Sequence, residues 1–411
     1  MKRKILWISM MMPYDKVGHA GGKSFNYYIN RFAEDDDNEV SLIAKVLPEE
    51  EKFVFTLNPK IKFYPVATPK NKIKCILSYI KSFSSKFNPS YPYGNVLTKE
   101  IFDQMERQLK KMKEESYYPN VIILEWTWMM LWIDVVKKYF PKAKYIATEH
   151  DVSFLGYRRK ADIEKNIIRK KYKQLQFENV MKREIIAANK CDCVLTLNEK
   201  DKKLLVNEGI DNTKVQVIAP YFVKPQKVER NPNKKDILFY GAMGRPENAI
   251  SAIWFVKNVL PLLQDFDVRF IILGSNPTKE IQELQSDRVV VTGFVDDVTP
   301  YFEKSMCMAA PLQLGAGIKI KILEALSMGI PVFTNDIGIE GIDAVDGRDY
   351  IHCITPEEYS ESIIKLINGD IDIKKLSVNA IKLINDNFDF KQSFDKYSKR
   401  VYDYAKNDIK E

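Results

Sequence analysis

The sequence has few residues of the types that build disulfide scaffolds, metal centres or membrane spans. Its 411 residues include only five cysteines, scattered along the chain, and three histidines. Unpaired cysteines are typical of a reducing compartment, so we expect a cytoplasmic protein. No segment supplies the roughly 20 uninterrupted apolar residues of a membrane span. The nearest, residues 121–136, carries Glu125 and Asp134, so we expect a soluble protein that is at most peripheral to the inner face of the cell membrane.

Paired acidic metal ligands are also missing. A run of three aspartates, residues 35–37, falls at a predicted helix end, where solvent exposure accounts for it. We therefore predict no metal site.

Positive charge is present but unevenly spread. The net charge is +8; residues 70–86 contain five lysines and no acid, and residues 158–173 hold eight basic residues against Asp162 and Glu164. Such blocks attract nucleic acid, anionic lipid or phosphorylated substrates. A solvated helix face is the simpler interpretation, and for residues 158–173 the favoured one. We expect an anionic membrane surface, and no nucleic acid, among the partners.

The apolar residues of segment 69–87 recur at helical spacing, with lysines on the other faces. A basic amphipathic helix of this kind suits a membrane surface. Packing of its apolar face on a sheet explains the pattern equally well, so both interpretations stay open.

Short β-branched runs alternate with amphipathic stretches, and the alternation occurs twice. The first set of predicted strands covers residues 4–10, 39–46, 120–126, 144–150, 191–198 and 214–220; the second covers 236–243, 268–274, 289–295, 306–312, 331–335 and 350–355. Residues 221–235 are rich in Pro, Lys and Asn and predict a linker. The pattern predicts an α/β protein with two doubly wound, Rossmann-like domains, residues 1–222 and 223–389, facing a cleft. We expect a helix at about 390–411 to cross back onto the first domain.

The most informative segment is residues 311–332. A strand is followed by a turn with Gly315 and Gly317, and then by a helix that ends near Met328. Helical spacing would place Gly317, Lys321 and Glu324 on one face. Free amides at a helix N-terminus bind phosphate, and Lys319 or Lys321 would neutralise its charge. An ordinary strand–turn–helix unit is the alternative.

Two features of the first half lie where a ligand site is expected. The first is the glycine-containing segment 17–24, which follows the first strand. Its Gly18 and Gly22 enclose three residues, whereas the phosphate loop of NTPases needs four, so the spacing disfavours an NTPase. His150 ends the strand at 144–150, where a sheet opens to ligand, although a packing role is the alternative.

The second half resembles the C-terminal domain of retaining glycosyltransferases of family 4, which have the GT-B fold. The resemblance rests on residues 237–263, 293–305 and 311–332 and runs from about residue 236 to the end, whereas the first half matches more loosely. In that family two glutamates stand eight positions apart. Glu324 takes the place of the second and is implied to hold the donor ribose, whereas the first falls on Ala316, which places the chain in a branch with the pattern GxGxKxK.

The resemblance implies further donor-binding residues. They are Gly21, Gly22, Arg245, Phe294, Val295, Gly317, Ile318 and Lys319. Phe294 and Val295 correspond to the loop whose backbone contacts the base. The Arg with which the family grips the pyrophosphate is replaced here by Ala242, and Arg245 is implied to take its role. The alternative is that Arg245 is only a turn residue. His150 is implied to lie beside the donor sugar.

The implied activity is transfer of a sugar from a nucleotide diphosphate donor to a glycan or lipid-linked acceptor, with retention of configuration and without metal or other cofactor. Surface polysaccharide or glycolipid synthesis is the expected setting. A nucleotide-sugar 2-epimerase of the same fold is one alternative. A catalytically silent partner subunit is another, because Ala316 replaces an acid.

Overall fold

The computed structural model describes residues 2–15, 17, 20–68, 98–222, 230–233 and 235–407. The chain forms two compact units: unit 1 is Met1–Tyr221 with Phe390–Glu411, and unit 2 is Phe222–Asp389. The predicted amphipathic helix at residues 69–87, the lysine block at 70–86 and part of the predicted linker lie outside the described residues, as does Gly18.

Unit 1 contains a parallel sheet of seven strands in the order β3-β2-β1-β4-β5-β6-β7. The strands are β1 (Arg3–Ser9), β2 (Asn38–Val46), β3 (Ile61–Ala67), β4 (Val121–Glu125), β5 (Lys144–Glu149), β6 (Cys193–Thr196) and β7 (Val215–Val217). Residues 5–8 of β1 and 121–124 of β4 are fully buried. Burial on both faces is what the continuous apolar runs predicted.

The edge strand β3 is absent from the sequence prediction. Its buried residues, Ile61, Tyr64 and Val66, are separated by exposed ones that include Lys62 and Pro65. Proline has no N–H to donate and is tolerated at a sheet edge, so a real strand here resembles a loop in sequence.

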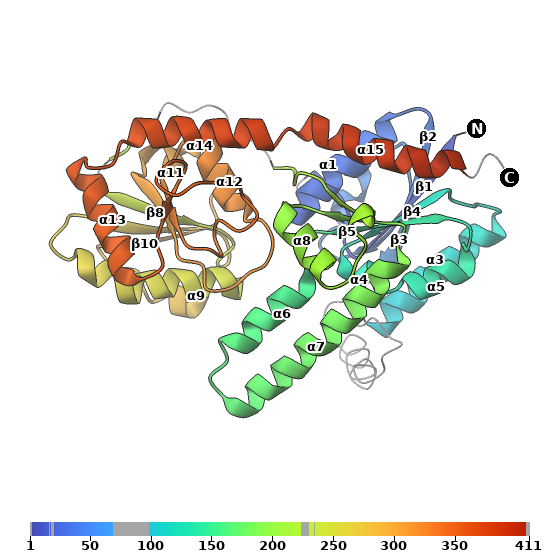
Figure 1. The fold of residues 1–411 in the computed structure, drawn as a ribbon, viewed down its shortest axis with the longest axis horizontal. Helices are drawn as coiled ribbons and strands as arrows, with labels where there is room; N and C mark the ends of the chain where they lie inside the picture. The colour runs from blue at the N-terminus through green and yellow to red at the C-terminus, as the bar shows by residue number, and fades with distance from the viewer. Residues whose placement is uncertain are drawn as a thin grey trace. The chain divides into compact units, whose positions relative to one another are not determined.

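Helices cover both faces of the unit 1 sheet (Figure 1). They are α1 (Ala20–Glu34), η1 (Glu51–Thr56), α3 (Lys99–Glu114), α4 (Thr127–Met130), α5 (Ile133–Tyr139), α6 (Ser153–Asp162), α7 (Ile167–Lys190), α8 (Glu199–Asn207), η2 (Asn212–Lys214) and α15 (Phe390–Asn407). Phe25 of α1 and Tyr397 of α15 share a core on one face. Met105 and Leu109 of α3 belong to the core on the other face. The C-terminal helix is therefore part of unit 1.

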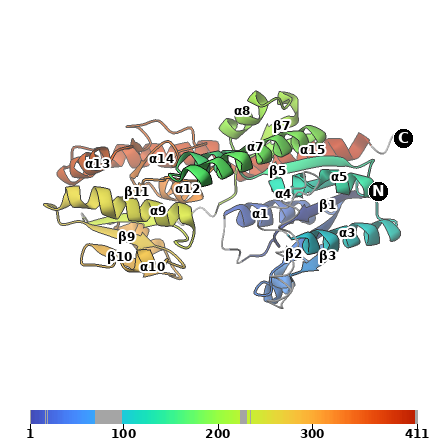
Figure 2. The same ribbon diagram turned by 90° about the horizontal axis from the view of Figure 1, so that it is seen from below.

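Unit 2 contains a second parallel sheet, of six strands in the order β10-β9-β8-β11-β12-β13. The strands are β8 (Asp236–Tyr240), β9 (Arg269–Leu273), β10 (Val289–Gly293), β11 (Cys307–Ala310), β12 (Val332–Thr334) and β13 (Ile351–His352). The helices are α9 (Pro246–Trp254), which continues as η3 (Phe255–Val259) and η4 (Leu260–Leu263), then α10 (Lys279–Gln282), α11 (Thr299–Lys304), α12 (Ile320–Ser327), α13 (Pro356–Asn368) and α14 (Ile373–Asn387). In Figures 1 and 2, α9 lies on one face of this sheet and α12 with α14 on the other. The two sheets confirm the predicted fold class.

Local sequence explains where several helices begin and end. Thr355 accepts the backbone N–H of Glu358, whose carboxylate returns the bond, and Gly369 ends α13 in the left-handed conformation at φ 84°. The helix predicted at residues 247–263 changes its winding at Phe255 and again at Leu260. Pro261 cannot donate the backbone hydrogen bond that a continuing α-helix would need.

The two strand orders locate the functional edges. In each sheet the first strand of the unit lies beside a later one, β1 beside β4 and β8 beside β11. From each of these pairs the chain connections run in opposite directions along the sheet. Such a reversal leaves a crevice at the carboxyl ends of the two strands. Each unit thus has one edge at which a ligand is expected.

Candidate active site

At the carboxyl edge of unit 1, His150 is hydrogen-bonded to a buried carboxylate. Its Nε2 lies 2.6 Å from Oε1 of Glu125, the last residue of β4. The other oxygen of Glu125 accepts the indole N–H of Trp7 at 3.1 Å. Because a carboxylate only accepts, Nε2 carries the hydrogen, and in the neutral imidazole Nδ1 is left as an acceptor.

The same imidazole is held in place by stacking. Its ring lies on the indole of Trp126, with centroids 4.6 Å apart and planes 18° from parallel. Trp126 has a φ of 70°, which is rare for a bulky residue and is found where the surroundings enforce a geometry. Nδ1 of His150 is buried and has no hydrogen-bond partner among the described residues. A buried, unpaired acceptor at the ligand edge is suited to a hydroxyl group.

Gly21, in the first turn of α1, lies against this pair. A Cβ at position 21 would lie 3.2 Å from Nδ1 of His150 and 3.4 Å from the Trp126 indole. Glycine therefore permits the close approach of the loop that follows β1. Gly22 beside it is buried. The structure thus brings the predicted residues Gly21, Gly22 and His150 together.

A second pair of acids lies behind His150. Glu149 accepts a hydrogen bond from the hydroxyl of Thr127 at 2.6 Å, and Glu184 of α7 accepts the backbone N–H groups of Ser153 and Phe154 at 2.8 and 3.0 Å. Burial raises the pKa of Glu149 to about 8. Burial, and then the charge of Glu149, raise the pKa of Glu184. Glu184 thus joins the start of α6 to the C-terminal part of α7.

In unit 2, the loop between β11 and α12 leaves the sheet at the point where the strand order reverses. Gly315 and Gly317 have φ of 129° and 67°, conformations that favour glycine. The prediction that Gly317 shares a helical face with Lys321 and Glu324 was wrong, because α12 begins at Ile320, with Lys319 as its N-cap. A residue with positive φ cannot belong to a right-handed helix.

The two lysines of this segment have different surroundings. The ammonium of Lys319 donates to the carbonyl of Gly317 and lies 3.2 Å from the buried carboxylate of Glu340. Lys321 donates to the side-chain carbonyl of Asn248 and lies over the ring of Phe239, 4.8 Å from its centroid. Lys319 is thus neutralised by a neighbouring acid, and Lys321 has no such direct ion pair in the described residues.

Burial, and then the positive charge of Arg245, lower the pKa of Lys321 to about 7. A Cβ on Gly241, the residue after β8, would lie 3.0 Å from its Nζ. Arg245 itself is largely exposed, caps α9 and pairs with Glu247. Lys321 therefore lies near the charge of Arg245, which is itself paired with Glu247, at the carboxyl end of β8.

Glu324 is buried one turn further along α12, with 9% of its surface exposed. It interacts with Tyr240, the last residue of β8: burial, then the Glu324 charge and a hydrogen bond to it, raise the pKa of the Tyr240 hydroxyl. The carboxylate is thus held at the same edge as Lys321.

The last predicted pair, Phe294 and Val295, follows β10 at the edge of the sheet. Gly293 turns the chain with a φ of 68°, and 74% of Phe294 is exposed. These residues lie at the carboxyl end of β10, which β9 separates from β8.

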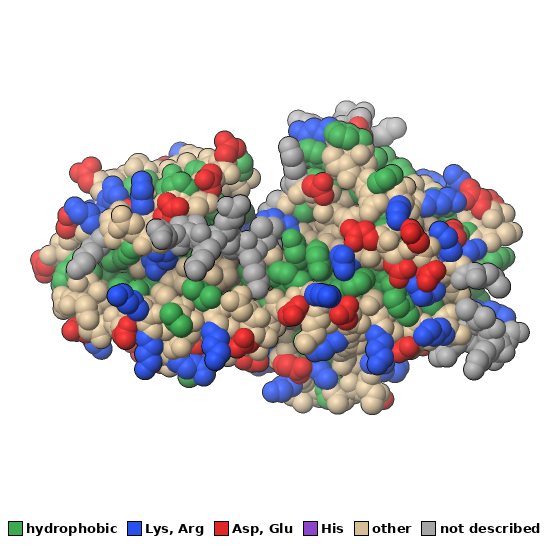
Figure 3. Space-filling model, turned by 90° about the horizontal axis from the view of Figure 1, so that it is seen from above, with side chains coloured by type: hydrophobic (Ala, Val, Ile, Leu, Met, Phe, Trp, Pro, Cys, Tyr) green, Lys and Arg blue, Asp and Glu red, His purple; other side chains and the backbone are tan. Residues whose placement is uncertain are grey.

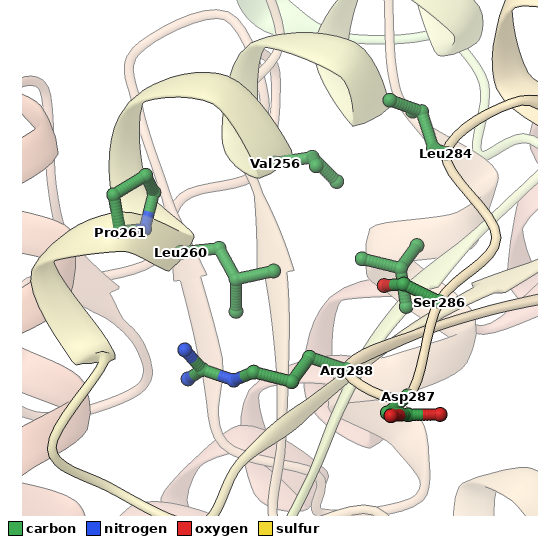
Figure 4. Close-up of a pocket in the computed structure, with 8 residues that line it drawn as sticks. Val256, Leu260, Pro261, Leu284, Ser286, Asp287 and Arg288 are labelled. Carbon is green, nitrogen blue, oxygen red and sulfur yellow. The ribbon is translucent and has the colours of Figure 1, made fainter.

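A hollow of about 410 Å³ in unit 2 lies elsewhere (Figure 4). Val256 and Leu260 line one side, Leu284 the other, and Arg288 crosses below them. Arg288 precedes β10, so the hollow lies at the amino end of that strand, and its guanidinium already donates to the carbonyl of Leu263 at 2.7 Å. Ligands of open α/β sheets bind at the opposite end.

Within the described ranges, no three His, Cys, Asp or Glu side chains are grouped to hold a metal ion. In the same part of the chain no helix is both long and apolar enough to cross a membrane.

Sequence reasoning missed Glu125, Trp126, Tyr240 and Asn248. A signal existed for Glu125, an acid that ends an apolar strand as His150 follows another. Nothing in the sequence marks Asn248, because its partner Lys321 is 73 residues away.

Comparison with known proteins identifies a family domain in unit 2. Residues 234–369 match the family described as glycosyl transferases group 1. A curated protein of Klebsiella pneumoniae, described as an uncharacterized 44.6 kDa protein in cps region, is 23% identical over 156 residues, which are 35% of this chain. The match spans 40% of that relative's length.

Solved structures are similar over nearly the whole chain. Sucrose-phosphate synthase from Thermosynechococcus elongatus has a TM-score of 0.67 at 13% identity, covering 98% of this chain and 99% of its own. Anabaena HepE in complex with UDP-glucose has a TM-score of 0.65 at 12% identity, covering 97% and 99%. The lipopolysaccharide outer core galactosyltransferase WaaB has a TM-score of 0.63 at 12% identity, covering 97% and 99%. At such identities these structures show the GT-B fold.

Proposed function

Because residues 234–369 form a glycosyl transferases group 1 domain in a chain of the GT-B fold, we propose that this protein is a retaining glycosyltransferase that uses a nucleotide diphosphate sugar. The observation that carries the proposal is the position of one loop. Within the matched domain, Gly315 to Lys319 leave the sheet at the β8–β11 reversal and lead into α12, with Lys321 and buried Glu324 on the helix.

We assign the diphosphate to this loop. Glycine lets the backbone approach the phosphates, with Gly317, Ile318 and Lys319 at the start of the helix. Lys321 and Arg245 supply positive charge, and they replace the arrangement we expected around Lys319, which Glu340 neutralises. Fixed positive groups stabilise the departing diphosphate in the transition state, which is the part a metal plays elsewhere.

We assign the nucleoside to Glu324 and to the loop after β10. A buried carboxylate accepts hydrogen bonds from the two ribose hydroxyls. Backbone groups at Phe294 and Val295 then contact the base. Since HepE was solved with UDP-glucose, a uridine diphosphate sugar is the first donor to test.

We assign His150 and the glycines Gly21 and Gly22 to the sugar and its phosphates. The free Nδ1 of His150 accepts a hydrogen bond from a sugar hydroxyl. In a retaining transfer without an enzyme nucleophile, the acceptor attacks from the side of the leaving group, and the departing phosphate oxygen takes the acceptor's proton. His150 then positions the sugar as positive charge develops on it.

The acceptor we propose is a glycan or a lipid-linked glycan in surface polysaccharide or glycolipid synthesis. Two of the similar proteins support this setting. WaaB is a galactosyltransferase of the lipopolysaccharide outer core, and the Klebsiella relative is a protein of a cps region.

The test measures donor binding and transfer separately. A ligand that binds only the folded state raises the melting temperature, so a screen of UDP, GDP, ADP and their sugars identifies the base. We expect Glu324→Gln to lose most of this stabilisation while Tyr240→Phe, which removes a neighbour of that carboxylate, keeps most of it.

Product analysis separates the alternatives. Donor incubated alone should yield no epimer, whereas addition of acceptor should yield a product with retained configuration. An epimer formed without acceptor would identify an isomerase. The absence of binding by every nucleotide would favour a silent partner subunit.

A further inference from the structure

Helices α6 and α7 form an antiparallel hairpin that projects from unit 1 (Figure 1). The buried residues of α7 are Glu184, Ala187 and Ala188, all near its C-terminal end. Before them, Phe177, Val180 and Met181 are partly buried and pack against the core, whereas residues 167–172, in the first turns of α7, are exposed. The stability of unit 1 therefore does not explain the exposed first turns of α7.

The hairpin concentrates exposed apolar side chains. Of the fourteen large apolar side chains that are exposed among the described residues, six lie on it: Ile163, Ile167, Ile168, Tyr172, Leu175 and Ile186. Ile167 and Ile168 are 84% and 82% exposed. Ile168, Tyr172 and Leu175 are spaced by four and three residues, so they form one stripe along the outer face of α7. Scattered surface apolar residues need no explanation, but a stripe of this kind indicates a contact.

Basic residues flank the stripe. Six exposed ones lie between residues 158 and 171: Arg158, Lys160, Lys165, Arg169, Lys170 and Lys171. Of the two acids in this segment, Glu164 is paired with Lys173 at 2.6 Å, so most of the basic charge is not balanced locally. The face shown in Figure 3 differs, because acidic and basic side chains are interspersed on it.

An apolar stripe flanked by basic residues favours one kind of partner surface. A second copy would bring an equally basic hairpin against the first, and like charges repel. An anionic membrane accepts both parts, because its headgroups attract the bases while apolar side chains enter the boundary between headgroups and acyl chains. We propose that the α6–α7 hairpin docks unit 1 on an anionic lipid membrane through Ile168, Tyr172 and Leu175, with Arg169, Lys170 and Lys171 at the lipid phosphates.

The hairpin is also joined to the candidate active site. Glu184 of α7 holds the first backbone N–H groups of α6, and Glu149 lies beside it, one residue before His150. Docking would therefore leave the carboxyl edge of unit 1 about 24 Å of helix away from Ile168, because 16 residues at 1.5 Å each separate it from Glu184. The proposal does not depend on transferase activity, since vesicle binding is measured without donor or acceptor.

The experiment is co-sedimentation of the full chain with vesicles of pure phosphatidylcholine and of equimolar phosphatidylcholine and phosphatidylglycerol. We expect binding to the anionic vesicles that weakens with salt. The variant R169E/K170E/K171E should bind them more than about tenfold more weakly, because each base near an anionic surface contributes about 1 kcal/mol. The variant I168S/L175S should also bind more weakly, and with the remaining binding more sensitive to salt.

A matched control reverses three exposed lysines on α14, K374E/K375E/K382E, and should keep vesicle binding. The UDP-induced shift in melting temperature should be the same in all three variants, which separates this proposal from the proposed function. Equal binding to both kinds of vesicle, an equal loss in the α14 variant, or no vesicle binding together with a dimer that I168S/L175S dissociates, would each overturn the proposal.

A second experiment tests whether the stripe itself enters the membrane. An environment-sensitive fluorophore at Ile168→Cys, in a Cys75→Ser background, should shift its emission to the blue on anionic vesicles. The same label at Val378→Cys on α14 should not. No shift at position 168, or equal shifts at both positions, would contradict insertion of the stripe.

Discussion

Glu125 holds His150 by its Nε2, at 2.6 Å, and leaves Nδ1 facing Gly21 in the first turn of α1. Since Nε2 must carry the hydrogen in this bond, the carboxylate fixes both the orientation and the tautomer of the imidazole. Glu125 has no assigned contact with substrate and is a positioning residue.

The first prediction concerns this pair. Glu125→Gln removes a charge-assisted hydrogen bond, which is worth about 1.5–3 kcal/mol, so turnover should fall about tenfold or more. The UDP-induced shift in melting temperature should not change, because Glu324 and Lys321 are untouched. Steady-state kinetics of transfer, with kcat and KM separated, measure this.

Two comparisons make that result specific. Glu106→Gln weakens an equivalent bond, from the Tyr139 hydroxyl at 2.9 Å, and should leave turnover unchanged. In a His150→Ala background, Glu125→Gln should cost little more, because residues that act as a unit are not additive. Additive losses would show that Glu125 does not act through His150.

The second prediction uses the space at Gly21. In Gly21→Ala the new methyl group, at 3.2 Å from Nδ1, displaces the imidazole or blocks its free acceptor. Alanine also favours the helix by about 1 kcal/mol, so the free energy of unfolding should change little. We expect a stable protein with reduced transfer, measured by denaturant unfolding and kinetics. A destabilised but fully active variant would contradict the assignment of this edge to the sugar.

The third prediction is proton uptake on donor binding. The pKa of Lys321 is about 7 because the side chain is buried beside Arg245, and a bound diphosphate would raise it. Between pH 7 and the ordinary lysine pKa of 10.5, binding should therefore take up a proton, and affinity should fall as pH rises. Calorimetry of UDP binding in two buffers of different ionisation enthalpy measures the uptake.

The control for this measurement is Lys321→Met, which should bind UDP more weakly and remove most of the uptake. An unchanged uptake in that variant would assign the proton to another group.

The fourth prediction concerns stability and pH. The pKa of Glu149 is raised by burial from 4.5 to about 8, so the folded state binds a proton that the unfolded state releases. The stabilisation is fully present below about pH 4.5 and is lost as pH rises toward 8. Glu149→Gln should flatten this part of the stability curve, measured by urea unfolding at several pH values. A parallel curve for the variant would show that the acid pair does not take up the proton.

The fifth prediction is that transfer needs no metal. Positive groups at Lys321 and Arg245 are assigned the role of stabilising the diphosphate, so turnover should be the same in the presence of a chelator. Loss of turnover on chelation and recovery with a divalent cation would contradict it.

The comparison of sequence and structure shows which features were local. The turn at Gly315 and Gly317 and the helix after it follow from neighbouring residues, so their order was predictable, and only the start of the helix was misplaced. The choice between Lys319 and Lys321 was not predictable, because it depends on Glu340, 21 residues away, and Asn248, 73 residues away. Strand β3 was missed because Pro65 and Lys62 are allowed at an edge.

The first half shows the same distinction. His150 could be predicted at the sheet edge because a polar residue ends an apolar run. Its partner Glu125 required the pairing of β4 with β5, in which Glu125 lies beside Thr148, and no single segment contains that information.

The most direct test of the account is a crystal structure of the protein with UDP bound. We predict the diphosphate at the backbone of residues 315–321, with Lys321 near its oxygens and the ribose hydroxyls on the carboxylate of Glu324. A nucleotide bound at another edge, or a Glu324 carboxylate still turned to Tyr240 and without a ribose contact, would contradict it.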